Sequence, residues 1–269
     1  MNAAVTVFFL ILRVFSLYFL AVSLFGLCRR RTPEPAARLR RFAVLIAARN
    51  EESCIAGLIE SLRAQHYPPE LVDIWVLPNN CTDRTAEAAR RAGAQVLEMP
   101  ASVRSKGAAL HTAAKALLRS ARNYDAFCVF DADNEADPAF LSEMNRALDR
   151  TAIVKSRILA KNRTQAGISA CYEIYFCSAN HFLNRAREAV GLSARVIGTG
   201  FAIRRDLLEA LDGFPCRTLT EDAELYAACL CRGARIGYCE TAVTYDEEPV
   251  TWRASLVQRR RWMLSLIHI

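Results

Sequence analysis

The sequence has few of the residues that build structural metal sites or disulfide frameworks. It contains only four scattered histidines, and none of its ten cysteines forms a Cys-x-x-Cys pair, the nearest two being Cys229 and Cys231. Zinc sites and redox-active dithiols both depend on such spacing. We therefore expect the cysteines to be buried free thiols in a reducing compartment.

The sequence also lacks an internal repeat, a low-complexity tract and a basic helix with interleaved aromatic residues. Its formal net charge of +7 would suit a nucleic-acid binder, but no nucleic-acid-binding motif accompanies that charge. Anionic lipid is the better partner for it, and we expect no nucleic-acid partner. The 269 residues, 52% of them hydrophobic, are enough for one α/β domain and a short additional segment.

The additional segment lies at the start of the chain. Residues 3–27 are almost wholly apolar, with Arg13 as the only charge, and can cross a hydrocarbon core of about 30 Å as a helix. A removable signal peptide would be shorter and followed by small residues, whereas arginines follow here at 29–31. Positive flanks stay on the cytoplasmic side of a membrane. We predict a single-pass anchor at 1–28, a basic linker at 29–41, and the remaining chain in the cytoplasm.

From residue 42 onward, short apolar runs alternate with stretches of helical periodicity. The pattern predicts strands at 42–47, 72–77, 95–97 and 126–130, and helices at 83–92, 105–120 and 138–149. This succession is typical of an α/β fold with a mostly parallel sheet and helices on both faces. The second half is less regular, with a long helix expected at 168–189 and a glycine-marked strand at 198–203, where the backbone can approach a ligand or form a bulge.

Two carboxylates, one residue apart, follow the expected strand 126–130. Alternate positions of an extended chain share a face, so Asp131 and Asp133 point the same way. Open α/β sheets bind ligands at the carboxyl ends of their strands. Hard cations such as Mg²⁺ or Mn²⁺ prefer oxygen ligands from carboxylates and phosphates. The pair therefore predicts a site for a divalent cation and a diphosphate.

Other interpretations of this acidic segment are open. A calcium-binding loop would need Gly and Glu where the chain has Ala136 and Ser142. A phosphatase that forms an aspartyl phosphate also places its nucleophile after a buried strand, but the surrounding motifs fit it poorly. Asp137 stands before Pro138 at an expected helix start, so we assign Asp137 to capping that helix.

Further polar clusters lie at expected strand ends or helix starts. They are Ala47-Ala48-Arg49-Asn50-Glu51-Glu52, Asn79-Asn80-Cys81-Thr82-Asp83, Lys106-Gly107 and Thr220-Glu221-Asp222. Each also has an ordinary interpretation: Asn50, Asp83 and Thr220 as helix caps, and Lys106 as a surface lysine. The basic cluster Gln258-Arg259-Arg260-Arg261-Trp262 could belong to a helix lying on a membrane surface.

Together and in this order, the motifs resemble those of the membrane-bound family 2 glycosyltransferases, which include cellulose, chitin, hyaluronan and poly-N-acetylglucosamine synthases. The resemblance rests on Asp-x-Asp at 131–133, Thr-Glu-Asp at 220–222 and Gln-x-x-Arg-Trp at 258–262, and covers residues 42–262. It implies a GT-A nucleotide-diphosphosugar transferase fold, Mg²⁺ or Mn²⁺ as cofactor, and inversion at the anomeric carbon. The catalytic domain would occupy 42–250 and an interfacial helix 251–269.

The resemblance also implies roles for the matching residues. The implied substrate-binding residues are Ala48, Asn50, Glu51, Asn79, Lys106, Asp131, Glu221, Gln258, Arg261 and Trp262. The implied metal ligands are Asp131 and Asp133, and the implied general base is Asp222. In a single inverting displacement, one carboxylate takes the proton of the acceptor hydroxyl while a cation neutralises the departing diphosphate.

Two features depart from the resemblance. Asn79 stands where many relatives carry Asp, which bears on nucleotide preference, and the sequence ends at Ile269 where relatives continue into further membrane helices. We therefore expect a truncated chain.

The resemblance predicts a membrane-anchored glycosyltransferase that moves a sugar from a nucleotide-diphosphosugar, most often a UDP-sugar, to a lipid or glycan acceptor. One alternative is a catalytically inactive membrane scaffold with the same fold. The other is a nucleotidyltransferase that forms nucleotide sugars, which would need a glycine-rich phosphate loop, and residues 47–52 contain no glycine.

Overall fold

The computed structural model describes residues 3–28, 35–215, 218 and 220–267. The helices and strands are, in chain order, α1 (Ala3–Leu24), η1 (Phe25–Leu27), β1 (Phe42–Ala48), α2 (Ile55–Arg63), η2 (Pro69–Leu71), β2 (Val72–Pro78), α3 (Thr85–Arg91), β3 (Gln95–Val96), α4 (Lys106–Leu118), β4 (Ala126–Asp131), β5 (Glu135–Ala136), α5 (Phe140–Ala147), β6 (Ile153–Ala160), α6 (Gly167–Ser178), η3 (Ala179–Arg185), α7 (Ala186–Ala189), β7 (Phe201–Arg204), α8 (Arg205–Ala210), α9 (Glu221–Cys231), β8 (Ile236–Asp246) and α10 (Trp252–Ile267).

The strands form one eight-stranded sheet with the order β3-β2-β1-β4-β7-β6-β8-β5. The pairs β2–β3, β1–β2, β1–β4 and β6–β8 are parallel, whereas β7 is antiparallel to both β4 and β6, and β5 is antiparallel to β8. The predicted α/β fold is confirmed, and the predicted parallel pairing holds for the first half of the chain. The second half is mixed because β7 runs against its neighbours.

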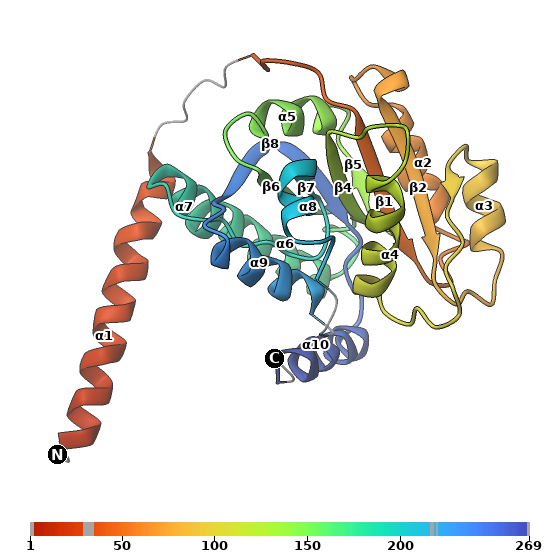
Figure 1. Cartoon of the computed structure of the whole chain (residues 1–269). Coiled ribbons are helices and arrows are strands. Elements are labelled where there is room, and N and C mark those ends of the chain that lie inside the picture. The colour runs from red at the N-terminus through yellow and green to blue at the C-terminus, as the bar shows by residue number, and fades with distance from the viewer. Residues whose placement is uncertain (1–2, 29–34, 216–217, 219, 268–269) are drawn as a thin grey trace.

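Helices cover both faces of the sheet (Figure 1). Along β1, Val44 and Ile46 pack toward α2, α3 and α5, whereas Ala43 and Leu45 pack toward α4, α8 and α9. The strand is therefore buried on both sides, which explains its unbroken apolar sequence. The strand order changes direction between β1 and β4, because β2 and β3 lie on one side of this pair and the later strands lie on the other. The carboxyl ends of β1 and β4 therefore lie at a topological switch point of the sheet.

The helix predicted at 168–189 is a continuous helical run, α6–η3–α7, with a π-helical middle from Ala179 to Arg185. Tyr172 and Phe176 of α6 pack with Ile158 of β6 in an apolar cluster separate from the two on the faces of the sheet around β1. Between Gly167 and Ala189, the run therefore forms one helical layer against the second half of the sheet.

Helix α1 projects away from the rest of the molecule, and none of its residues is buried (Figure 1). Within the described ranges, the 25 residues Ala3–Leu27 are the single helical stretch long and apolar enough to cross a membrane, with a mean hydropathy of 2.3. Its end is tied to the α6–η3–α7 run, because Arg185 Nη2 donates to the carbonyl of Cys28 at 2.7 Å.

Several local expectations need correction. Helix α5 begins at Phe140 and not at 138, although Asp137 Oδ1 accepts from the backbone N–H of Ala139 at 2.9 Å, just before that helix. The described cysteines are free, but they are not all buried: Cys128, Cys229 and Cys239 are, whereas Cys28, Cys171 and Cys231 are exposed. Burial raises the pKa of the Cys229 thiol to about 12, so that thiol is unreactive at neutral pH.

The glycine-marked strand begins later than predicted, at Phe201, and residues 198–200 form the segment that precedes it. Gly200 has φ +59°, and a Cβ there would lie 2.5 Å from both Ser156 Oγ and Thr244 Oγ1. Those two hydroxyls form a buried hydrogen bond of 2.9 Å with each other. The backbone of this segment therefore lies directly on the β6–β8 pair, with no room for a side chain.

We expect Gly200→Ala to lower the free energy of unfolding by about 1–3 kcal/mol more than Gly233→Ala. Both positions have left-handed backbone, but an alanine at Gly233, with φ +70°, would have no atom within 4 Å, so that control isolates the backbone strain. Denaturant unfolding of the two purified variants measures the difference. Equal destabilisation would contradict the packing described for Gly200.

Candidate active site

The carboxyl ends of β1, β2 and β4 lie side by side. Asp131 ends β4 and is in register with Ala47 of β1, while Ala48 is in register with Pro78 of β2. The polar clusters that follow these strands are therefore brought to one edge of the sheet, as the sequence predicted. This edge is where the open sheet can receive a ligand.

The loops after β1 and β2 are tied together by several hydrogen bonds. Asn50, with φ +60°, accepts from the backbone N–H of Thr82 at 2.8 Å. The backbone N–H groups of Glu51 and Glu52 donate to Thr85 Oγ1 at 2.8 Å and Asp83 Oδ2 at 3.1 Å. The two loops therefore form one rigid wall.

The helix-cap interpretation is wrong for Asn50. Helix α2 begins at Ile55, and its N-cap residue, Cys54, makes no side-chain capping bond. For Asp83 the helix-cap interpretation is nearly correct, because Asp83 Oδ1 accepts a hydrogen bond from the Thr85 N–H, at 3.1 Å, at the start of α3. The hydrogen bond from the Thr85 hydroxyl holds the pKa of Asp83 below its usual value.

Ala48 and Asn79 form the floor between these loops, and both are buried. The Asn79 N–H donates to the carbonyl of Ala48 at 2.9 Å, and its side-chain oxygen accepts from Asn80 Nδ2 at 2.9 Å. Asn80 Nδ2 also donates to the Val103 carbonyl at 2.6 Å. The side-chain amide of Asn79 is thus held in place by its neighbour Asn80.

Lys106 joins three elements at the centre of the site. Its ammonium lies 2.5 Å from Asp131 Oδ1, 2.6 Å from the carbonyl of Gly198 and 3.4 Å from Glu221 Oε1. Burial acts to lower the pKa of Lys106, but the negative charges of Asp131 and Glu221 outweigh burial and hold that pKa above its ordinary value. Lys106 is therefore a permanent cation within the site, and the surface-lysine interpretation is wrong.

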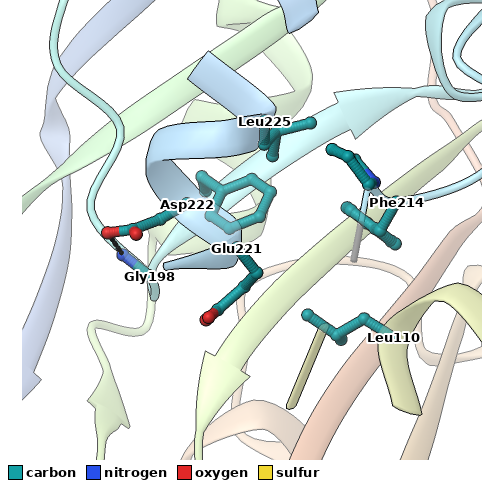
Figure 2. Close-up of a pocket in the computed structure, with 8 residues that line it drawn as sticks. Leu110, Gly198, Phe214, Glu221, Asp222 and Leu225 are labelled. Carbon is teal, nitrogen blue, oxygen red and sulfur yellow. Dashed lines mark hydrogen bonds between the residues drawn. The ribbon is translucent and has the colours of Figure 1, made fainter. Parts of the chain in front are cut away.

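The first turn of α9 places two further carboxylates beside Lys106. Asp222 Oδ2 accepts from the backbone N–H of Gly198 at 3.1 Å, and Asp222 Oδ1 accepts from the Ala223 N–H at 2.8 Å. Figure 2 shows the carboxylates of Glu221 and Asp222 directed away from the apolar side chains of Leu225 and Phe214. Burial raises the pKa of Glu221.

The cavity drawn in Figure 2 is small, about 10 Å³, and is lined both by these two acids and by apolar side chains such as Leu110 and Phe214. Thr220 occupies the N-cap position of α9 but makes no side-chain capping bond, and no described residue hydrogen-bonds to its buried hydroxyl. The predicted capping role of Thr220 is therefore wrong.

Asn134 and Thr199, which the sequence analysis did not select as site residues, hold the backbone of Asp131. The Asp131 N–H donates to Thr199 Oγ1 at 3.0 Å and to Asn134 Oδ1 at 3.1 Å. The Thr199 hydroxyl in turn donates to Asn134 Oδ1, and Asn134 Nδ2 donates to Asp246 Oδ1 at 3.0 Å. Asn134 directly follows the Asp-x-Asp motif in the sequence, and that position could have marked it as a site residue.

Lys155 is a second missed residue, and it lies beneath the site with 1% of its surface exposed. Its ammonium donates to the carbonyls of Thr199 at 2.7 Å and Gly200 at 3.2 Å. Burial lowers the pKa of Lys155 to about 7, against the opposing charge of Asp246, whose own pKa burial raises. A lone lysine within the apolar strand β6 was the signal, since unpaired buried charges are rare.

Asp131 and Asp133 have the chemistry of a divalent-cation site. Burial, followed by the charge of Asp131, raises the pKa of Asp133 to about 6, and Glu51 and Glu247 act in the same direction. Such a surplus of negative oxygen donors suits a hard cation. In the described part of the chain, no three Asp, Glu, His or Cys side chains form a metal-binding group. The remaining ligands would therefore come from diphosphate and water.

Gln258 lies on α10, which packs on α6. Its side-chain oxygen accepts from the hydroxyl of Tyr172 at 3.1 Å, and that hydroxyl also lies 3.0 Å from Ser255 Oγ. The guanidinium of Arg259 stacks on the Tyr172 ring, 5.2 Å from its centre. The side chains of Arg261 and Trp262 lie outside the described residues, so their predicted role stays a prediction.

The family model described as "Glycosyltransferase like family 2" matches residues 40–265. The chain belongs to this family. Among curated proteins it is 27% identical to "Probable glycosyltransferase YdaM" of Bacillus subtilis, over 85% of this chain and 56% of that protein. It is 26% identical to a beta-monoglucosyldiacylglycerol synthase of Synechocystis, over 81% of this chain and 46% of that protein. The chain thus spans about half the length of the curated relatives it matches.

Solved structures of two other enzymes share the fold. A mannosyltransferase from Pyrobaculum calidifontis, in complex with GDP-Man and Mn²⁺, matches with a TM-score of 0.71 and 20% identity over 93% of this chain and 69% of that one. Glucosyl-3-phosphoglycerate synthase from Mycobacterium tuberculosis, in complex with Mn²⁺, UDP and phosphoglyceric acid, matches with a TM-score of 0.57 and 23% identity over 85% and 78%.

These comparisons confirm the predicted GT-A fold and the predicted membership of glycosyltransferase family 2. The roles predicted for individual site residues, the subfamily of polysaccharide synthases and the division into segments stay predictions.

Proposed function

We propose that the chain transfers a hexose from a nucleotide-diphosphosugar, with UDP as the nucleotide, to a lipid acceptor at a membrane. The observation that carries this proposal is the convergence of Asp131, Lys106, Glu221 and Asp222 around the backbone of Gly198. Lys106 and these carboxylates lie close together, which supports the proposal that Asp131 serves a metal and Asp222 a proton.

The proposed chemistry divides between the two sides of the site. Asp131 and Asp133 would hold Mg²⁺ or Mn²⁺, which supplies positive charge to the leaving diphosphate when bound. Lys106, kept charged by Asp131 and Glu221, adds a fixed positive charge on the same side. Asp222 takes the proton of the acceptor hydroxyl on the opposite face of the sugar, which gives inversion.

The remaining predicted binding residues fit this division. Ala48, Asn50, Glu51 and Asn79 line the wall and floor made by the loops after β1 and β2, where the nucleotide would lie. Gln258, Arg261 and Trp262 belong to α10, which we propose to close over the acceptor side. In this proposal, the catalytic domain covers 42–250 and the interfacial helix begins at 251.

A lipid acceptor is supported by the names of the Synechocystis relative and two further cyanobacterial relatives, all beta-monoglucosyldiacylglycerol synthases. It is also supported by exposed apolar residues on α10, such as Trp252, Leu256 and Met263, which suit a lipid surface. These relatives favour a single-sugar lipid product over a polysaccharide.

We further propose that α1 anchors the chain with Met1 outside and the catalytic domain in the cytoplasm, because arginines at 29–31 follow the apolar stretch. Protease added to intact cells should spare the domain and should digest it after lysis. Digestion in intact cells would contradict this orientation.

The experiment that tests the function uses the full chain in lipid nanodiscs with diacylglycerol, Mn²⁺ or Mg²⁺, and a panel of UDP- and GDP-sugars. We expect release of nucleotide and formation of a glycolipid with one UDP-hexose, both dependent on metal. The Asp222→Asn variant is the control for contaminating activity. Nucleotide release without a glycolipid would contradict the lipid acceptor, and binding of every donor without turnover would favour an inactive scaffold.

A further inference from the structure

A second cavity lies between the strands β6 and β8 and the α6–η3 helical run, apart from the active-site residues. Its volume is about 260 Å³, room for several water molecules at about 30 Å³ each. Arg157 of β6 and Glu240 of β8 line it on the sheet side, and Ser178, His181 and Phe182 line it on the helix side. The π-helical turn of η3 forms part of the wall, and such turns are frequent at functional sites.

Two guanidinium groups lie at this cavity: Arg157 lines it, and Arg185 lies beside the lining residues His181 and Glu240. Arg157 Nε is buried, and no described residue accepts a hydrogen bond from it. Arg185 Nη1 lies 3.4 Å from His181 Nδ1, and Arg185 Nε lies 3.7 Å from Glu240. Glu240 is the one carboxylate among the described lining residues, and it forms an ion pair with Arg185. A buried guanidinium N–H without an acceptor is costly, and a phosphate oxygen is the acceptor that guanidinium geometry fits best.

The helix face around the mouth of the cavity is apolar. Ile174, Tyr175 and Phe182 are exposed by 67%, 50% and 47%, and Phe182 also lines the cavity. They lie along one stripe of the α6–η3 run with the exposed Cys171 and Ser178, and no charged residue belongs to that stripe. A contiguous uncharged face of this kind indicates an interaction surface and is unusual for a helix exposed to water.

The same helical run receives the end of α1. Gly26 is buried against it so closely that a Cβ would lie 2.5 Å from the carbonyl oxygen of His181, and Arg185 binds the carbonyl of Cys28. If α1 crosses the membrane, His181 and Phe182 are held at the level where lipid headgroups begin. Figure 1 shows the end of α1 meeting the molecule beside α7, which continues this run.

We propose that the cavity binds the phosphate of an anionic membrane lipid, with the Arg157 guanidinium contacting the phosphate, Arg185 adding positive charge beside the cavity, and the acyl chains lying along Ile174, Tyr175 and Phe182. The continuity of the apolar stripe with α1 selects a bilayer lipid as the occupant. The proposal does not depend on sugar transfer. It adds a lipid contact that fixes the height and tilt of the domain on the membrane, apart from any acceptor lipid.

The test uses the full chain in a detergent without phosphate, with no nucleotide sugar present. Thermal unfolding is followed while dihexanoyl-phosphatidylglycerol, dihexanoyl-phosphatidylcholine or inorganic phosphate is added. We expect a rise in Tm with phosphatidylglycerol alone. In Arg157→Gln the apparent affinity for phosphatidylglycerol should fall about tenfold or more, whereas Arg232→Gln, which changes an exposed arginine at the end of α9, should leave it unchanged.

A second variant keeps the test decisive if Arg157→Gln fails to fold. Ser178→Trp places a bulky ring at the exposed edge of the cavity without removing a charge, and it should block phosphatidylglycerol equally. An equal response to phosphatidylcholine would show binding to the apolar stripe only. An equal response to inorganic phosphate would show an anion site that does not recognise lipid. Either result, or unchanged affinity in both variants, would overturn the proposal.

Discussion

Replacing Asp131 or Asp133 by asparagine should lower the rate of sugar transfer by roughly 10²–10³-fold or more, while the fold is retained. Each change removes a negative oxygen donor from the proposed cation site. Asp131→Asn also removes the charge that lies 2.5 Å from the Lys106 ammonium, so its effect should be the larger of the two. Initial rates at saturating donor, measured over a range of Mn²⁺ concentrations, give both the loss and any shift in metal requirement.

The acidic segment provides its own control. Asp137 is a nearby carboxylate that accepts from the Ala139 N–H before α5, so Asp137→Asn should change transfer little. Thermal unfolding checks that all three variants are folded. Activity of the unmodified chain that survives exhaustive chelation, or a fully active Asp133→Asn, would remove the metal from the mechanism.

Asp222→Asn should lower turnover by about 10²–10⁴-fold and leave nucleotide-sugar binding intact. The asparagine carbonyl can still accept from the Gly198 N–H, so the loop keeps its anchor, but the side chain can no longer take a proton. Binding of the donor is measured by calorimetry and turnover by glycolipid formation, which separates the two effects.

Glu221→Gln is the matched variant one residue earlier. Glu221 lies 3.4 Å from Lys106 and helps to hold its charge, so its loss should act on donor affinity more than on turnover. If Asp222→Asn abolished donor binding and kept full turnover at saturating donor, Asp222 would be a binding residue and another group would have to serve as the base.

The edge of the sheet that carries the site could be predicted from sequence because it depends on local patterns. β1 and β4 are buried on both faces and read as continuous apolar runs, and β2 departs from that pattern only at Asp73. The polar residues that follow these parallel strands must gather at one edge. The direction of β7 could not be predicted in the same way. A run of apolar residues specifies a buried strand but carries no information on the direction of that strand. The direction of β7 depends on its pairing with β4 and β6, which lie far from it in the sequence.

The residues whose roles were predicted wrongly, or missed, show a second limit of prediction from sequence. Asn50 and Thr220 are good capping residues by type, but Asn50 is used to bind Thr82 in another loop, and Thr220 leaves its helix uncapped. Lys155 and Asn134 act through partners 44 and 112 residues away, Thr199 and Asp246. Such contacts are set by tertiary structure, and no spacing within the sequence encodes them.

The position of β8 in the sheet has a consequence for how the protein is made. β8 comes last among the strands of the described residues, yet it pairs with β6, which precedes it by more than 70 residues, and with β5. Most of the domain must therefore leave the ribosome before β5, and the edge of β6 that faces away from β7, can be paired and before Asp246 reaches Asn134. Until then the nascent chain carries unpaired strand edges, the feature that makes late-closing sheets prone to aggregate and dependent on chaperones.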